Sequence, residues 1–544
     1  MMSSRKALYG TWTSPITTDA LVQKNIPLLD VLVDPVTDKV YHLERRSAEG
    51  GRAVVVDTST GADVIGQEWN ATTRRSALHV ARIRPDANGG FALEDNERIA
   101  WDDPGREIVV GFPQWIDGET LLFTSDETGY LNPRIYSVPS KTHTALLASP
   151  ISQDFSDIPW RLGGSPYTIL PASNGSAKAD SILLSAFSQG RQILYLLDLT
   201  SKTLVPVESP FVEVVSIRAT GPASVVFIAK SPTAPQAVVH LTLQPSVSHP
   251  DIVHTTHRVL KSSMDSSPFP TGIVSQPLPL TLDIGGEPVH VVLYQPTNPA
   301  YDGSTDASER PPCIVNAHGG PTSYAGQGIN WEKQYFTSRG WAWLDVNYGG
   351  SSGYGRKYAD RLYGTWGVAD VADVAHAATQ LASEPHQLID PARTAVRGSS
   401  SGGFTVLAAL CTFPRAFAAG ASLYGISDLR ALTEGSHKFE HKYMDKLLGG
   451  SYDDVPEVYE ERSPVSNAQK IGCPLLILQG LEDRVVPPEQ AEVIVAKVRG
   501  HGGQVEYVAF EGEAHGWARA ETVKRALEAE RGFYERVFGI AGGP

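Results

Sequence analysis

Residues 397–404 read RGSSSGGF and contain the pattern G-x-S-x-G, with Ser400 at its centre. A short β-prone run, 394–396, precedes the pattern, and an apolar run from Phe404 to Leu410 follows it. This order predicts a strand, a sharp turn and a helix, because the two glycines of the pattern leave room for the neighbouring strand and helix. Such a turn would hold Ser400 above a sheet, at a helix N-terminus. The pattern alone also fits a Gly/Ser loop, since the chain holds 50 glycines, so its surroundings must decide.

Those surroundings alternate between β-prone and helix-prone stretches from about residue 275 onward. Alternation of this kind predicts a mostly parallel sheet covered on both faces by helices. In such a sheet the chemistry gathers at the C-terminal ends of the strands. We therefore expect a catalytic domain over residues 275–544. The predicted strands are 290–296, 312–317, 341–347, 394–398, 474–479 and 505–510, and the predicted helices include 367–381, 488–498 and 521–538.

A serine hydroxyl is a weak nucleophile that needs a nearby base, and the base needs a carboxylate to orient it. The fold that carries a nucleophile on such a turn supplies these groups in the order Ser, Asp, His. Asp483 follows the predicted strand 474–479, and His515 follows the predicted strand 505–510. Each residue alone would be a solvated loop side chain. Together, in this order and at strand exits, Ser400, Asp483 and His515 are predicted to be catalytic.

Acyl transfer also needs donors for the negative charge that develops on the attacked carbonyl oxygen. The run His318-Gly319-Gly320 follows the predicted strand 312–317, where a donor loop of the HGGG type is expected. We assign one donor to the backbone N–H of Gly320 and the other to that of Ser401. The alternative is that this run is an ordinary turn.

Between about residues 30 and 260 the sequence pattern is typical of β-strands, with pairs of apolar runs joined by turns. Blades of a propeller take roughly 40–45 residues each, so this region predicts a reduced β-propeller of roughly five to seven blades. A pair of β-sandwiches is the alternative. Residues 70–108 are poorly patterned and fit either a shortened blade or a loop. A Ser/Pro/His-rich stretch at 243–275 marks the boundary, so the propeller-like domain is placed at 28–265.

The amino-acid composition argues against several classes of partner. The chain has 46 basic and 60 acidic residues, a net charge of −14, and no basic stripe, which argues against nucleic acid as a partner. No run is apolar enough for a membrane span, and the first residues lack the core of a signal peptide. The three cysteines, Cys313, Cys411 and Cys473, are odd in number and lie in apolar runs, which fits buried thiols in a reducing compartment. We expect a cytoplasmic protein without metal or cofactor, and leave open whether it forms a homo-oligomer.

Several stretches resemble the prolyl oligopeptidase family, specifically its acylaminoacyl-peptidase and dipeptidyl-aminopeptidase-like branch. They lie mostly within 310–540 and read HGGPTSYAG, DVNYGGSSGYGRKYADRLYGTWGVADVAD, RGSSSGGF, LQGLEDRVVPP and FEGEAHGW. The resemblance implies a β-propeller capping an α/β-hydrolase domain, with the N-terminal segment, 1–27, packing on the hydrolase. It also implies cleavage of short peptides or acyl-peptides. It favours Asp483 over the adjacent Glu482, because Asp483 stands closer to the R-V-V-P-P turn typical of the family.

Two residues are weaker candidates for substrate binding. Glu44, with its charged neighbours in YHLERRSAEGGR, would reach the central cavity, or would belong to a solvated hairpin with weak ion pairs. Tyr424 would line the acyl pocket or pack in the core. Asp370 and Asp373 are expected to be structural carboxylates rather than a second acid/base pair.

The sequence thus predicts a serine hydrolase that cleaves short peptides or N-acylated peptides through an acyl-enzyme. The same three residues would also serve an esterase, lactonase or amidase acting on a small metabolite, which a reduced propeller would admit. A binding module without activity is a third reading, disfavoured by the complete Ser-Asp-His set.

Overall fold

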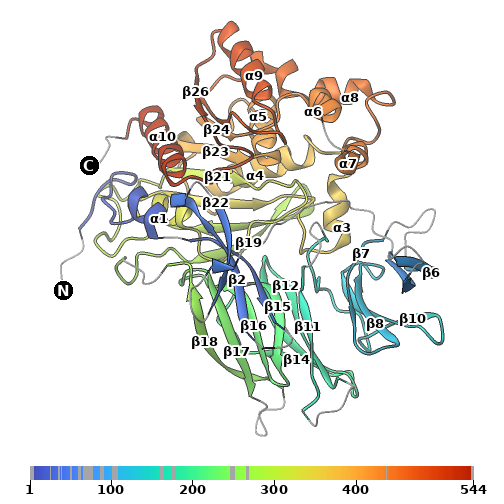
Figure 1. The fold of residues 1–544 in the computed structure, drawn as a ribbon. Coiled ribbons are helices and arrows are strands. Elements are labelled where there is room, and N and C mark those ends of the chain that lie inside the picture. Colours follow the sequence, from blue (N-terminus) through green and yellow to red (C-terminus); the bar gives the residue numbers. More distant parts are fainter. Residues whose placement is uncertain are drawn as a thin grey trace.

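The computed structural model describes residues 5–24, 26–34, 37, 39–49, 52–58, 63–64, 78–85, 91–100, 108–159, 164–173, 179–244, 251–264, 269–435 and 438–540. Figure 1 shows two regions: antiparallel sheets from the first half of the chain lie below a layered α/β region from the second half.

The N-terminal region contains four four-stranded sheets, each built from consecutive antiparallel strands. Their strands are β1 Leu28–Val33, β2 Val40–Arg46, β3 Arg52–Asp57 and β4 Asp63–Val64; β7 Val110–Trp115, β8 Thr120–Ser125, β9 Asn132–Ser137 and β10 Thr142–Ala145; β11 Tyr167–Leu170, β12 Ser181–Ser188, β13 Arg191–Asp198 and β14 Leu204–Val207; and β15 Glu213–Gly221, β16 Ser224–Lys230, β17 Ala237–Gln244 and β18 His254–Ser262. A two-stranded sheet, β5 Leu78–Pro85 and β6 Phe91–Ala100, lies in the poorly patterned stretch.

Apolar clusters join the sheets from β5–β6 onward to their neighbours along the chain, and one cluster joins the first sheet to the last. Leu28 and Val31 of β1 pack with Val226 and Ile228 of β16 and with Val238 of β17. Contact between the first and last sheets is what a closed ring of sheets needs, and a pair of stacked sandwiches would not require it. The arrangement therefore favours the propeller-like expectation over the sandwich alternative.

The C-terminal region is organised on one eight-stranded sheet of order β19-β20-β22-β21-β23-β24-β25-β26. The first three strands in this order pair antiparallel, and the pairs from β22–β21 to β25–β26 are parallel. The strands are β19 Pro277–Ile284, β20 Glu287–Tyr294, β21 Cys313–Ala317, β22 Ala342–Asn347, β23 Thr394–Ser399, β24 Ala419–Leu423, β25 Leu475–Gly480 and β26 Val505–Phe510.

Helices cover this sheet on both faces. The α-helices are α1 Thr18–Lys24, α2 Trp331–Thr337, α3 Arg356–Ala359, α4 Ala369–Ala382, α5 Ser401–Thr412, α6 Leu429–Gly435, α7 Lys438–Leu448, α8 Pro456–Arg462, α9 Pro488–Gly500 and α10 Ala520–Phe538. Short 3-10 helices are η1 Ser47–Glu49, η2 Asp360–Leu362, η3 Pro391–Arg393, η4 Pro464–Ser466 and η5 Ala468–Lys470.

Successive residues of the central strands enter opposite cores, as the two-residue period of a strand requires. Val396 and Ile477 pack with α4, α5 and α9 on one face. Ala395 and Leu476 pack with α2 and α10 on the other. Because both faces are covered, these strands are apolar throughout rather than alternating in polarity.

The N-terminal segment lies against the C-terminal region. Helix α1 contacts α10, and Asp19 forms an ion pair with Lys524. The ring of Trp12 stacks on that of Tyr301 at 5.0 Å. The segment thereby extends the second core of the large sheet.

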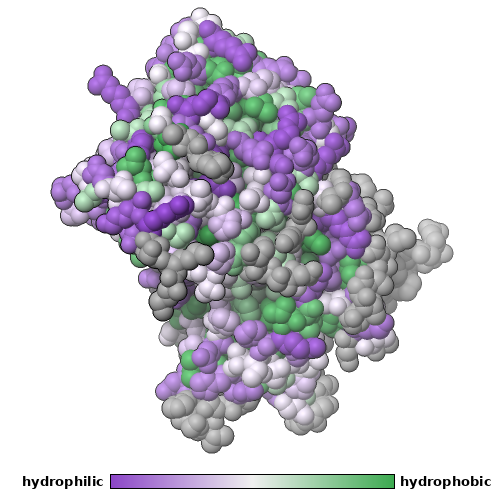
Figure 2. All heavy atoms as spheres, turned by 90° about the vertical axis from the view of Figure 1, so that its left-hand side faces the viewer, coloured by the Kyte–Doolittle hydropathy of each residue, from purple (hydrophilic) through white to green (hydrophobic). Residues whose placement is uncertain are grey.

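None of the helices in the described part of the chain combines the length and apolar character needed to cross a membrane. On the face shown in Figure 2, hydrophilic side chains are spread widely over the upper half, where the C-terminal region lies, with smaller hydrophobic areas between them.

Candidate active site

Ser400 stands between β23 and α5, on a backbone turn that few residues adopt. Its φ of 57° and ψ of −125° lie outside the usual regions for a residue with a side chain. A Cβ on Gly398 would lie 2.3 Å from the Gly402 carbonyl oxygen, and one on Gly402 would lie 2.2 Å from that of Ala317. These close approaches are the physical reason for both glycines, and they hold Ser400 at the C-terminal edge of the sheet.

Two hydrogen bonds link Ser400 to the other predicted residues. The Oγ of Ser400 lies 2.8 Å from Nε2 of His515, and Nδ1 of His515 lies 2.7 Å from Oδ2 of Asp483. Asp483 follows β25 and His515 follows β26, so all three side chains stand at exits of parallel strands. The structure therefore brings together the three residues in the order that the chemistry requires.

The Asp483 carboxylate is buried, whereas the adjacent Glu482 is exposed. Its Oδ1 accepts hydrogen bonds from the backbone N–H groups of Val485 and Val486, at 2.8 and 2.9 Å. These bonds fix one oxygen and leave the other aimed at His515. The choice of Asp483 over Glu482 thus has a geometric basis.

The loop that carries His515 is fixed by Glu513, a residue that the sequence reasoning missed. The buried carboxylate of Glu513 accepts from the N–H groups of Ala518 and Arg519, at 2.9 and 3.0 Å. The Glu513 carbonyl also accepts from the N–H of Glu482 at 2.9 Å, which ties the two loops together. Its signal in the sequence is an acidic residue two positions before His515.

The glycine loop after β21 lies beside Ser400. A Cβ on Gly319 would be 3.6 Å from the Cβ of Ser400. Gly320 has a φ of +129°, which favours glycine, and a Cβ there would lie 2.8 Å from the Thr322 nitrogen. Ser401 is the first residue of α5 and is buried. The loop that carries Gly320 therefore lies beside the nucleophile, and Ser401 follows the nucleophile directly in the chain.

Tyr424 follows β24 and lies against His515. The two rings meet edge to face at 4.9 Å, and the ring of Trp517 contacts Tyr424 on another side at 5.0 Å. Burial raises the pKa of Tyr424, so its hydroxyl stays protonated. Tyr424 thus belongs to the wall around the imidazole. Trp517, another residue missed from the sequence, stands two positions after His515.

Comparisons with known proteins bear on this arrangement. A profile of the prolyl oligopeptidase family matches residues 327–541, which contain all three linked side chains. A dipeptidyl aminopeptidase BIII from Pseudoxanthomonas mexicana is 31% identical over 242 residues, which are 44% of this chain and 34% of that protein. The C-terminal region built on the eight-stranded sheet, called the hydrolase region below, is thus similar to the prolyl oligopeptidase family. The resemblance expected from the sequence is confirmed.

Similarity to this family also extends beyond the hydrolase region. The acylamino-acid-releasing enzyme of Sus scrofa is 24% identical over 92% of this chain and 68% of its own length. A puromycin-hydrolyzing peptidase of Mycobacterium tuberculosis is 28% identical, with a TM-score of 0.82 and 99% of both chains covered. The chain spans only about a third of the length of the first curated relatives it matches.

The other sequence candidate for substrate binding lies in the N-terminal sheets. Glu44 of β2 is 4% exposed, so it is not part of a solvated hairpin. Its carboxylate pairs with Nε2 of His42 at 3.1 Å and with Nε of Arg46 at 2.8 Å. Burial opposes ionisation of Glu44, but these two partners outweigh it and lower its pKa. Since the carboxylate is already paired, Glu44 is not carried into the proposed function.

Asp370 and Asp373 are buried in α4 and hold neighbouring loops, as structural carboxylates would. Asp370 accepts from the Thr405 hydroxyl at 2.6 Å and from the Gly367 N–H at 2.7 Å. Asp373 accepts from the N–H of Gly349 at 2.7 Å and pairs with Arg361. None of these contacts involves Ser400.

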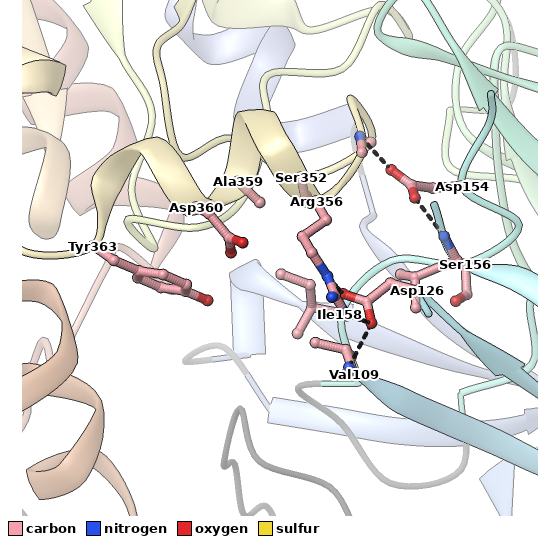
Figure 3. A pocket seen from close by; sticks show the side chains of 13 residues that line it. Val109, Asp126, Asp154, Ser156, Ile158, Ser352, Arg356, Ala359, Asp360 and Tyr363 are labelled. Carbon is pink, nitrogen blue, oxygen red and sulfur yellow. Dashed lines mark hydrogen bonds and ion pairs between the residues drawn. The ribbon is translucent and has the colours of Figure 1, made fainter. Parts of the chain in front are cut away.

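A small cavity lies where the propeller-like region meets the hydrolase (Figure 3). Arg356 of α3 forms an ion pair there with Asp126, next to β8. Asp154 accepts from the backbone N–H groups of Gly355 and Leu131, both at 2.8 Å. The cavity volume is about 30 Å³, which suits water molecules rather than a peptide. These contacts join the two regions, and we call the interface that they form the seam.

In the part of the chain that the structure describes, no group of three or more His, Cys, Asp or Glu side chains is placed to hold a metal ion.

Proposed function

We propose that this protein is a serine hydrolase that cleaves short peptides or N-acylated peptides through an acyl-enzyme. The observation that carries the proposal is the hydrogen-bonded series from Ser400 through His515 to Asp483, with Ser400 on a left-handed turn at a helix N-terminus. Similarity to a serine peptidase family supports the reaction class.

In acylation, Nε2 of His515 accepts the Ser400 proton as Oγ attacks the substrate carbonyl carbon. Asp483 accepts from the Nδ1–H of His515, keeps the ring in that tautomer, and stabilises the imidazolium. The N–H groups of Gly320 and Ser401 donate to the oxygen that becomes negative. His515 then returns the proton to the leaving nitrogen, and the C–N bond breaks.

Deacylation repeats these roles with water. His515 removes a proton from the water molecule, which attacks the ester carbonyl of the acyl-enzyme. The same donors stabilise the second tetrahedral intermediate. Collapse releases the acid and restores the Ser400 hydroxyl, so the cycle uses only side chains and backbone groups already named.

A small amide is the second candidate substrate. It is favoured by the neighbours that cover 99% of the chain, which hydrolyse puromycin. Puromycin is an aminoacyl amide of a nucleoside, so the bond to be broken is of the same kind as a peptide bond. Tyr424 and Trp517 would provide an apolar surface beside His515 for either substrate.

We propose further that the N-terminal sheets form a ring of about five blades, from the four four-stranded sheets and the two-stranded sheet β5–β6. The packing of β1 against β15 and β16 supports closure of the ring. A ring seated on the hydrolase region would exclude folded proteins by size. Cleavage should therefore fall as substrate length increases.

A substrate panel tests this proposal. The rates of hydrolysis are measured for the wild type and for Ser400→Ala. The substrates are aminoacyl anilides, acyl-peptides, puromycin and short-chain esters. We expect amide cleavage by the wild type and at least about a 10³-fold loss in Ser400→Ala. Ester turnover without any amide cleavage would contradict the peptidase assignment. Turnover that persists in Ser400→Ala would contradict the whole mechanism.

A further inference from the structure

Three aromatic rings connect the imidazole of His515 to the core on one face of the sheet, and the mechanism above gives them no step. The ring of Tyr424 meets that of His515 edge to face at 4.9 Å. The ring of Trp517 contacts Tyr424 at 5.0 Å and 85°, and Phe510 at 4.8 Å and 64°. Phe510 is buried, whereas Tyr424 and Trp517 are half-buried. The series is therefore anchored in the core at Phe510 and open to a ligand where it approaches His515.

The backbone of Tyr424 has an unusual conformation that fits a role at the site. Its φ is 38°, in the left-handed region that favours glycine. Such a conformation costs free energy and persists only where its surroundings enforce it, which happens most often at functional sites. The Tyr424 N–H donates to the Leu478 carbonyl at 2.7 Å, and its hydroxyl bonds to the side chain of Ser399. The ring thus reaches from the end of β24 to the residue before the nucleophile.

The leaving group has a defined place in this site, because His515 must return its proton to the leaving nitrogen. The carbonyl oxygen is held by backbone donors, one of them on Ser401 at the start of α5. Helix α5 packs on one face of the sheet, with Val396 and Ile477. The three aromatic rings pack on the opposite face, with α2 and α10. The donors therefore hold the oxygen toward one face, which leaves the side of the rings for the leaving nitrogen at Nε2.

We propose that Tyr424 and Trp517 bind the leaving group, and that they select amines built on a planar aromatic ring over aliphatic amines. This inference rests on the proposed function, because a leaving group exists only if Ser400 attacks a carbonyl. An aromatic leaving group extends the series of rings with the offset or edge-to-face contacts that aromatic pairs prefer. The proposal places Tyr424 on the leaving-group side of the scissile bond rather than in the acyl pocket.

The test compares leaving groups on one acyl group: 7-amino-4-methylcoumarin, aniline, cyclohexylamine and ammonia. For each amide, kcat/KM of the wild type is divided by that of Trp517→Ala, Trp517→Leu or Trp517→Phe, so the intrinsic reactivity of the bond cancels. In the Ala and Leu variants we expect a loss of about 10- to 50-fold for the two aromatic amides, and less than about threefold for the unsubstituted amide. Trp517→Phe, which keeps a planar ring, should recover most of the preference for aromatic amides.

Binding of free 7-amino-4-methylcoumarin supplies a second readout that needs no chemistry. It should inhibit the wild type competitively, and its inhibition constant should rise about 10-fold in Trp517→Ala. The same amine is titrated into Ser400→Ala by its fluorescence. Trp115→Ala is the matched control, since Trp115 of β7 is 51% exposed and belongs to the N-terminal sheets. This variant should keep all four rates and the inhibition constant within about twofold of the wild type.

Three outcomes would overturn the inference. One is an equal loss for all four leaving groups, which would mean that Trp517 only supports the loop of His515. The others are a Trp517→Leu variant with the wild-type preference, and a loss that follows the acyl group when the coumarin is kept and the acyl group is varied. Turnover that survives in Ser400→Ala instead contradicts the proposed function, whereas coumarin binding to that variant tests the aromatic surface separately. Should the Trp517 variants fail to fold, Tyr424→Leu is tested in the same comparison, with the same outcomes for and against.

Discussion

Two adjacent carboxylates, Glu482 and Asp483, show how burial selects a residue for chemistry. Both follow the same strand, and only Asp483 is buried with fixed hydrogen bonds. A carboxylate held in this way orients the imidazole and stabilises its charged form, whereas an exposed one is free to move.

Replacing Asp483 by asparagine should therefore lower kcat by about 10⁴-fold, because the amide favours the wrong tautomer of His515. Glu482→Gln is the matched control and should remain within about twofold of the wild type. Steady-state kinetics on one amide substrate measure both. A similar loss in the two variants, or a larger one in Glu482→Gln, would contradict the assignment.

Asp370 makes a second prediction, this time for stability. Burial raises its pKa to about 6, although the Thr405 hydroxyl and the Gly367 N–H oppose the shift. A raised pKa means that the carboxyl favours the folded state fully below its unfolded value of about 3.9, and that this contribution is lost as pH rises through 6. Above pH 6 the charged group should cost about 3 kcal/mol.

Asp370→Asn removes this charge while keeping an acceptor for the Gly367 N–H. Its amide would face the Thr405 hydroxyl, which can turn to the Ser401 carbonyl at 3.2 Å. We expect the melting temperature of the variant to exceed that of the wild type increasingly from pH 4 to 7. Thermal melts of both proteins across that range measure the gap, and a gap independent of pH would show that Asp370 is not the cause.

The sequence located Ser400, Asp483 and His515 because each follows a strongly patterned strand in a parallel sheet. Strand exits meet at one edge, so local pattern was enough to place them near one another. It could not predict the pairing of Glu44 with His42 and Arg46, because whether a polar side chain finds a buried partner depends on packing between strands.

At the scale of elements, the turn between β23 and α5 decides the position of the nucleophile. The sequence predicted this strand, turn and helix, as well as α4, α9 and α10 within a few residues. For the stretch around β5 and β6 the sequence did not predict individual strands, because its apolar residues do not repeat at a clear period.

Gly402→Ala should disrupt the turn, because the added Cβ would lie 2.2 Å from the Ala317 carbonyl and 2.9 Å from that of His318. Backbone cannot move aside cheaply, so we expect a stability loss of at least about 3 kcal/mol and a large loss of turnover. Gly472→Ala, where a Cβ would meet nothing within 4 Å, is the control. Chemical denaturation of both variants measures the difference, and equal midpoints would refute the steric argument.

At the scale of the whole molecule, the seam joins residues far apart in the sequence. Arg356 and Asp126 are 230 positions apart. No local pattern links such residues, and only the docking of the two regions brings them into contact. The seam is therefore the part of the fold that sequence reasoning could not supply.

Arg356→Met should weaken this seam, because it removes the cation of a largely buried ion pair and leaves the Asp126 carboxylate without that partner. The side chains are 20% and 9% exposed, so we expect a loss of about 2 kcal/mol, less than for a fully buried pair. Arg430→Met removes an exposed pair with Glu434 and should leave the unfolding midpoint nearly unchanged. Denaturant unfolding compares them, and an equal effect of the two substitutions would contradict a role for the seam in stability.

The central claim is that Ser400 is the nucleophile, and the most direct measurement is the site of covalent modification by a fluorophosphonate. Peptide mapping by mass spectrometry should find one adduct, on the peptide that contains Ser400, and none there in Ser400→Ala. Labelling of another residue with Ser400 left unmodified, while amide turnover is abolished, would contradict the account.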